Sequence, residues 1–168
     1  TLPFADTFPS IAEAIPGAAH YRPGDQNRVW TAAGFRFVPG ICYEAIFPGF
    51  VRKALEEMDG DVMLNFTNDV WFGDTSAAPL HLMLQQARAI ENRVWLVRST
   101  NSGISAFVDP TGTIRGRSDV GEVTNLALEV PIAKLQKSFY RRFGEVWLYL
   151  SVITALCFLG WKNRRALR

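Results

Sequence analysis

The sequence predicts a layered α/β domain followed by one long apolar helix. Strand-like and helix-like segments alternate between residues 34 and 130, and strands separated by helices are typical of a layered α/β domain. Residues 146–161 carry neither a charge nor a proline, a pattern that favours a membrane or buried helix. Of the 168 residues, 48% are hydrophobic and 20% are charged. This composition excludes a disordered chain and suits one domain of ordinary size.

Each expected element follows from its local pattern. Strands are expected at 34–41, 61–68, 94–100, 103–110 and 125–132, and helices at 50–58 and 79–93. Pro39 predicts an edge or a break in the first strand. The turn after residue 110 predicts a hairpin. The opening 33 residues contain four prolines and are expected to be extended loop with a short helix at 9–14.

Residues 143–161 are expected to form a transmembrane helix. The apolar run would span roughly 24 Å at about 1.5 Å per residue, a little less than the ~30 Å hydrocarbon core. Extension back to Phe143 adds length, and Trp147 and Trp161 lie at the two ends, where interfacial aromatic residues gather. The basic tail at 162–168 predicts a cytoplasmic C-terminus, which places the domain at 1–140 on the outer face. The alternative is a buried C-terminal helix of a soluble domain.

Charge and cysteine content narrow the partners and cofactors. The net charge of +2 is too small to predict a nucleic-acid partner. The two cysteines, Cys42 and Cys157, lie in different contexts and do not make a disulfide framework. Neither a metal-binding Cys/His cluster nor a phosphate loop is present, so we expect no metal and no cofactor. The chain begins with Thr1 rather than Met, which indicates a piece of a longer protein.

Cys42 follows the first expected strand directly and precedes a helix. Reactive groups of α/β proteins are exposed at this place, beyond the carboxyl end of a strand. A thiolate is a strong nucleophile when a base or a positive environment supports it, and Glu44 is close enough in sequence to orient the site. On this stretch alone an inert, half-buried thiol is the stronger interpretation, and a nucleophile remains open.

Polar and aromatic residues follow the strand expected at 61–68. Asn65, Asn68 and Asp69 cluster at its end, and Trp71 and Phe72 come next in a loop. Adjacent bulky aromatic side chains in a loop expose apolar area unless they cover something. The loop therefore either folds onto its own core or forms a lid or wall over an apolar ligand.

A second polar loop, STNSG, lies between two expected strands at 99–103. It is either a simple turn or a place where backbone amides and Asn101 approach a ligand. Neither His20 nor His81 has an obvious Ser, Asp or Cys partner in sequence. The helical spacing of His81 with Leu84 and Arg88 favours a structural role.

Taken together, these stretches resemble one family. The segments GICYEAIFP (40–48) and NFTNDVWFGDTSAAPLHLMLQQARAIENRVWLVRSTNSGISAFVDPTG (65–112), with the final hydrophobic run, are similar to the C-terminal portion of the apolipoprotein N-acyltransferase family. That family is a membrane branch of the nitrilase, or carbon–nitrogen hydrolase, superfamily. The similarity covers nearly the whole chain in order and spacing. It implies part of a nitrilase-like αββα sandwich with one C-terminal transmembrane helix.

The resemblance also implies site residues. Cys42 matches the nucleophile of a Glu-Lys-Cys triad, and Tyr43 and Glu44 match supporting residues beside it. Asp6 lies where the family usually has a glutamate, so its supporting role is less direct. Four residues of the two polar loops are expected to bind substrate: Asn68, Trp71, Phe72 and Asn101. Under this interpretation the two aromatic side chains line an apolar approach from the bilayer to the thiol.

The implied activity is acyl transfer at the bacterial inner membrane, with the domain on the periplasmic face. A phospholipid would donate its acyl chain to Cys42 as a thioester, and the free amine of a diacylglyceryl-cysteine lipoprotein would accept it. The triad glutamate and lysine are expected upstream of Thr1, so this chain alone is expected to be inactive. Two alternatives remain: an amide hydrolase of the same superfamily with a membrane anchor, and a non-catalytic membrane-tethered interaction domain.

Overall fold

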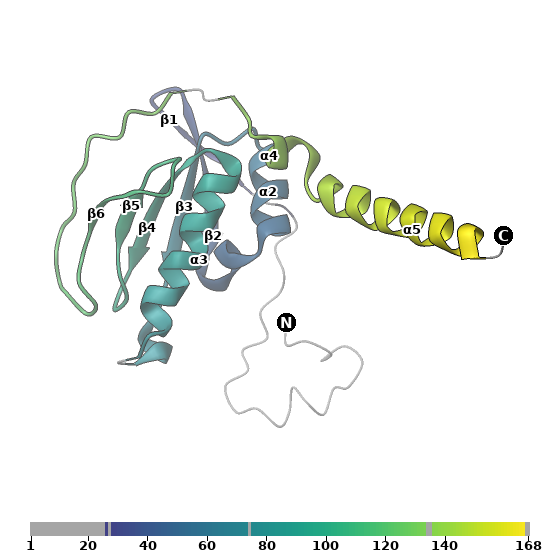
Figure 1. Ribbon diagram of the computed structural model, residues 1–168. Helices are drawn as coiled ribbons and strands as arrows, with labels where there is room; N and C mark the ends of the chain where they lie inside the picture. Colours follow the sequence, from purple (N-terminus) through teal and green to yellow (C-terminus); the bar gives the residue numbers. More distant parts are fainter. Residues whose placement is uncertain (1–25, 27, 74, 134–135, 167–168) are drawn as a thin grey trace, which may run out of the picture.

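A computed structural model describes residues 26, 28–73, 75–133 and 136–166 of the chain (Figure 1). Six strands form one sheet: β1 (Trp30–Ala32), β2 (Phe35–Ile41), β3 (Val62–Thr67), β4 (Trp95–Thr100), β5 (Ala106–Val108) and β6 (Ile114–Arg117). The helices are α2 (Pro48–Glu57), α3 (Ala77–Asn92), α4 (Phe139–Phe143) and α5 (Val146–Ala166). Two short 3-10 helices are also present: η1 (Cys42–Ile46) follows β2, and η2 (Val70–Phe72) follows β3.

The sheet is mixed, and its strands follow one another in chain order. β2, β3 and β4 run parallel, whereas β1, β5 and β6 pair antiparallel to their neighbours. The parallel register aligns Ile41 with Phe66 and Phe66 with Ser99. The segments that follow these three strands, which begin with Cys42, Asn68 and Asn101, therefore leave the same edge of the sheet.

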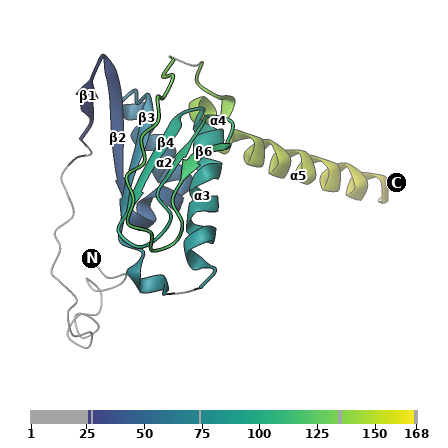
Figure 2. The same cartoon turned by 90° about the vertical axis from the view of Figure 1, so that its left-hand side faces the viewer.

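The hydrophobic core lies between one face of the sheet and helices α2 and α3. From the sheet come Val38, Met63, Leu96 and Val108, and from the helices come Val51, Ala54, Leu55, Leu82 and Ala89. These side chains are almost fully buried because the strand positions alternate with period two and the helix positions follow one face. In Figure 2, α3 runs along this face of the sheet.

The opposite face of the sheet is apolar but less covered in the described part of the chain. Trp30, Ile41 and Phe66 project from it and are 52%, 66% and 43% exposed. The rings of Trp30 and Phe66 lie 5.9 Å apart. An α/β fold with one sheet and helices on one face is thus confirmed, and a second sheet of the expected sandwich is not among the described residues.

Most predicted elements are confirmed with small boundary changes. The strand at 125–132 is wrong: this stretch has no strand pairing and is largely exposed, because apolar alternation makes a strand only where a partner edge is available. Phe37 is the last residue of β2 that pairs with β1. In the described part of the chain, Pro39 therefore pairs with β3 only, and the other edge of β2 is open at this position, as expected for a proline in a strand. The predicted helix at 9–14 lies outside the described residues.

Gly144, with a φ of 62°, separates α4 from α5. Figure 1 shows α5 extending away from the sheet and the other helices. Its apolar side chains, among them Trp147, Ile153 and Phe158, are exposed. Within the described ranges, no helix has both the length and the apolar character needed to cross a bilayer. The transmembrane helix expected at 143–161 is therefore not confirmed.

Arg141 anchors α4 to the domain. Its side chain is buried, and Nη2 donates to the carbonyl oxygens of Leu55 at 2.7 Å and Gly60 at 2.9 Å. Ser138 caps α4 by accepting a hydrogen bond from the Arg141 amide at 3.0 Å. The guanidinium thus gives the Leu55 carbonyl a second donor besides the Gly60 amide at 2.8 Å, and it links the segment that ends α2 to α4.

The Arg141→Met variant should lose about 2–3 kcal/mol of unfolding free energy, because the buried, charge-assisted hydrogen bonds from Arg141 to the Leu55 and Gly60 carbonyls are lost. Urea denaturation followed by circular dichroism measures the loss. The matched control is Arg142→Met, which changes an exposed neighbour on the same helix and should alter stability by no more than about 0.5 kcal/mol. Equal losses in the two variants would contradict the anchoring role of Arg141.

Candidate active site

Cys42 occupies a strained turn at the end of β2. It is the first residue of η1, is half-buried, and has a φ of 50°. A side chain in the left-handed region costs energy and persists only when its surroundings impose it. Glu44 contributes to this restraint, since its Oε2 accepts a hydrogen bond from the amide of Ile41 at 2.7 Å. The thiol is therefore held in a defined place beyond the carboxyl end of the strand.

Asn65 on β3 binds the backbone on both sides of Ile41. Its Nδ2 donates to the carbonyl oxygens of Gly40 at 3.1 Å and of Cys42 at 3.2 Å. The Asn65 side chain is fully buried. It ties β3 to the turn that carries the thiol.

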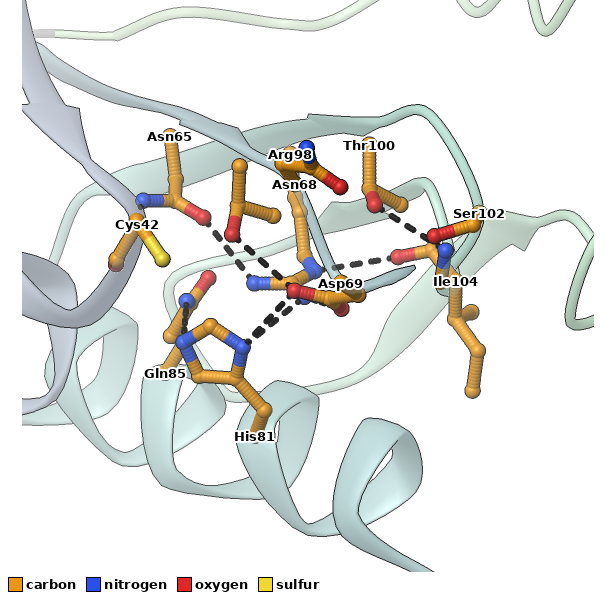
Figure 3. Close-up of polar contacts among 12 residues, drawn as sticks. Cys42, Asn65, Asn68, Asp69, His81, Gln85, Arg98, Thr100, Ser102 and Ile104 are labelled. Carbon is orange, nitrogen blue, oxygen red and sulfur yellow. Dashed lines mark hydrogen bonds and ion pairs between the residues drawn. The ribbon is translucent and has the colours of Figure 1, made fainter. Parts of the chain in front are cut away.

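Arg98 on β4 lies at the centre of a buried polar network (Figure 3). Nη1 donates to Oδ1 of Asn65 at 2.9 Å, and Nε donates to the carbonyl of Ile104 at 3.0 Å. Nη2 pairs with Oδ2 of Asp69 at 2.5 Å. The guanidinium is completely buried, so these contacts replace its hydration.

His81 on α3 completes the network from the helix side. Its Nδ1 lies 3.2 Å from Oδ1 of Asp69, and its Nε2 lies 3.0 Å from Nε2 of Gln85. The ring of Tyr43 stacks on His81 with centroids 5.4 Å apart, and Phe72 meets His81 edge-on at 5.5 Å. Residues of η1, η2 and α3 thus converge on one imidazole.

Burial and charge decide the protonation of this cluster. Burial lowers the pKa of His81, and the nearby positive charge of Arg98 lowers it further, against the opposing effect of Asp69. Burial also lowers the pKa of Arg98, while Asp69 and Cys42 raise it. His81 is therefore neutral at neutral pH, and it lies beside the ion pair of Arg98 with Asp69.

Three of the other predicted site residues, Asn68, Trp71 and Asn101, lie at the exposed rim. Asn68 is exposed and accepts a hydrogen bond from the Val70 amide at 3.1 Å. Trp71 is 86% exposed. Asn101 is also exposed, and its Oδ1 accepts a hydrogen bond from Ser102 Oγ at 3.2 Å. Asp6 falls outside the described residues.

A pocket of about 460 Å³ opens between the polar loops. It is lined by Asp69, Val70, Gly73, Ala78, Ser102 and Val120. The walls come from the segments after β3, β4 and β6, and Asp69 joins the pocket to the buried network. Gly103 permits this arrangement, because a Cβ there would lie 2.1 Å from Oδ2 of Asp69.

Sequence reasoning missed Arg98 and Gln85 and assigned His81 only a structural role. It recognised Asn65 and Asp69 as part of a polar cluster without giving either a function. A signal for Arg98 exists in VWLVRST, where one charge interrupts a buried apolar strand. A buried charge requires a partner, so this arginine predicts an acidic residue nearby.

Residues 8–141 match the carbon–nitrogen hydrolase family. The chain belongs to this family. Among solved structures of related proteins, Saccharomyces cerevisiae Nit3 of the nitrilase superfamily has a TM-score of 0.51 and 25% identity, and the match covers 61% of this chain and 40% of that one. A mutant amidase from Nesterenkonia sp. AN1 has a TM-score of 0.50 and 27% identity over 60% of this chain and 40% of its own. That structure shows covalent addition of an acetamide moiety at the active-site cysteine.

The curated relatives of this chain include apolipoprotein N-acyltransferases from several bacteria. The protein of that name from Geobacter metallireducens is 34% identical over 162 residues, which are 94% of this chain and 31% of the relative. Apolipoprotein N-acyltransferase 2 from Leptospira interrogans is 40% identical over 129 residues, or 74% and 22%. The chain thus spans about a third or less of the length of these relatives.

The lowered pKa of His81 predicts a pH-dependent stability. An unfolded histidine titrates near 6.5, so below that pH the unfolded chain binds a proton that the folded chain does not. The free energy of unfolding should therefore fall as the pH drops from about 7.5 to about 5.5. Denaturation across this range should show a shallower fall in the His81→Gln variant. An NMR titration that places the His81 pKa above about 6.5 would contradict the assignment.

Proposed function

We propose that this chain carries the cysteine nucleophile of an apolipoprotein N-acyltransferase. The observation that supports this proposal most concerns the two cysteines. The family match at 8–141 includes Cys42 and excludes Cys157, and Cys42 alone lies in a restrained turn beside a buried polar network. An amidase neighbour that reacts covalently at its active-site cysteine supports the same residue.

The proposed reaction has two acyl transfers. The Cys42 sulfur attacks the ester carbonyl carbon of a phospholipid, a C–S bond forms, and the C–O bond to the lysophospholipid breaks. The proton lost by the thiol goes to the departing alkoxide through a base. The free amine of a diacylglyceryl-cysteine lipoprotein then attacks the thioester, an amide forms, and the thiol is regenerated. The family resemblance implies a glutamate and a lysine upstream of Thr1 for these proton transfers.

The rim residues have roles that suit such substrates. Phe72 and Tyr43 pack on His81 and give the site an apolar border, and exposed Trp71 extends this border toward an acyl chain. Asn68 and Asn101 offer amide groups to the polar part of the donor or acceptor. Glu44 supports the nucleophile by holding the Ile41 amide, and a supporting role for Asp6 stays a prediction.

Location at a bacterial inner membrane is part of this proposal. The curated relatives carry the name of an enzyme that acts on lipoproteins. The periplasmic placement of the domain and the cytoplasmic placement of the C-terminus stay predictions from the basic tail.

An amide hydrolase is the second candidate, and the amidase neighbour favours it. Both candidates form an acyl group on Cys42 and differ only in the acceptor, which is water in the hydrolase and an amine in the transferase. The higher identity to the N-acyltransferases, up to 40%, is the reason for preferring the transferase.

An activated long-chain ester, p-nitrophenyl palmitate, tests the nucleophile in the chain itself, since its leaving group departs without a proton donor. We expect a palmitoyl thioester on Cys42 and much less on exposed Cys157, measured by peptide mass spectrometry. Cys42→Ser should abolish the adduct, and Cys157→Ser should not. Labelling confined to Cys157 would refute the proposal. Faster loss of the adduct with a diacylglyceryl-cysteine peptide than with water would favour the transferase over the hydrolase.

Trp71→Ala should slow acylation of Cys42 by the palmitoyl ester several-fold and leave acylation by p-nitrophenyl acetate unchanged, because only the long chain reaches the exposed indole. Stopped-flow release of p-nitrophenolate measures both rates. Folding should be unaffected, since the side chain is 86% exposed. Val123→Ala, at another fully exposed position, is the control. Equal slowing with both esters would remove Trp71 from the acyl-chain path.

A further inference from the structure

We propose that Arg98 and Asn65 are positioning residues that hold the backbone of the Cys42 turn without touching substrate. The contacts run from the Arg98 guanidinium to the Asn65 amide and from there to the carbonyls of Gly40 and Cys42. This inference rests on the proposed function, in which Cys42 is the nucleophile. It adds two residues whose effect on the thiol passes through the backbone.

The orientation of the Asn65 amide follows from its neighbours. Arg98 has donors only, so the Asn65 oxygen has to face Arg98 and the Asn65 NH₂ group has to face the two carbonyls. Rotating the amide by 180° would place oxygen against two carbonyl oxygens and nitrogen against the guanidinium. Arg98 therefore selects the one orientation in which Asn65 can bind the turn.

The bonds of Asn65 fall on two peptide groups that flank Cys42. The Gly40 carbonyl belongs to the peptide group that also contains the Ile41 amide, and Glu44 accepts a hydrogen bond from that amide. The Cys42 carbonyl belongs to the peptide group after Cys42. The relative rotation of these groups includes the φ of Cys42, which is 50°. Asn65 and Glu44 thus impose the strained conformation that points the thiol into the site.

Arg98 suits this positioning role because three contacts fix its guanidinium group. Asp69, the Ile104 carbonyl and Asn65 occupy three different nitrogens of one planar group. A lysine keeps the charge but has a single nitrogen on a flexible stem, and it cannot make all three contacts. Arg98→Lys therefore separates the geometric role from the charge.

The test uses the full chain with Cys157→Ser, so that Cys42 is the only thiol. Acylation of Cys42 by p-nitrophenyl palmitate should slow about tenfold or more in Arg98→Lys and in Asn65→Leu, because a displaced nucleophile loses its alignment. The double variant should be no slower than the slower single variant, since Arg98 acts through Asn65. Multiplying effects in the double variant, or unchanged rates in folded single variants, would overturn the inference. Asn65→Ser replaces Asn65→Leu in this cycle if the leucine variant does not fold.

Matched controls separate positioning from general destabilisation. Arg141→Lys and Asn92→Leu change an equally buried arginine and asparagine that contact other parts of the fold. Both should lower the melting temperature and leave the Cys42 acylation rate unchanged. Slowing in these controls equal to that in Arg98→Lys would show that loss of stability alone explains the effect.

Hydrogen exchange reads the same turn without any acyl chemistry. The Ile41 amide should exchange about tenfold faster or more in Arg98→Lys and Asn65→Leu, because its bond to Glu44 opens, and at the original rate in the two controls. Faster exchange with no acylation of the unaltered Cys42 would refute the proposed function and support the positioning role. Normal acylation of the unaltered Cys42, with unchanged exchange of the Ile41 amide in both variants, would support the proposed function and refute the positioning role.

Discussion

The ion pair between Arg98 and Asp69 is the constraint around which the site is built. Removing two such charges from water costs several kcal/mol per ion, and their attraction offsets that cost only when further hydrogen bonds complete the shell. Here Asn65, the Ile104 carbonyl and Thr67 complete it, the last by donating to Asp69 at 2.9 Å. The pair therefore requires β3, β4 and both polar loops to adopt their places together.

Parallel pairing explains why the turn that follows β2 and carries Cys42 is linked to an arginine two strands away. Gly40 is paired with Asn65, and Asn65 with Arg98, across β2, β3 and β4. Paired residues project from the same face of a sheet, so a row of backbone, amide and guanidinium forms directly beneath the turn. A shift of one residue in either pairing would turn Asn65 or Arg98 to the opposite face. Register thus determines the chemistry of the site as well as the packing of the core.

Local patterns predicted the central part of the fold well. Apolar periodicity marks β2, β3, β4, α2 and α3 because burial of those elements is regular. The segment at 125–132 shows the limit, since strand formation depends on a partner edge that its own residues do not reveal. The candidate nucleophile was found because Cys42 follows a strand and belongs to a recognisable stretch. Arg98 was missed because its partners are 29 and 33 residues away, and the α/β pattern does not encode their register.

The apolar sheet face opposite the helices bears on how the chain behaves in solution. Trp30, Ile41 and Phe66 present adjoining hydrocarbon surface. The exposed apolar side chains of α5, which extends away from the sheet in Figure 1, add a second apolar surface. Such surfaces associate with one another and with detergent. The association state of this chain therefore depends on protein concentration and on detergent. The acylation rate of Cys42 consequently depends on both quantities as well as on the chemistry of the thiol.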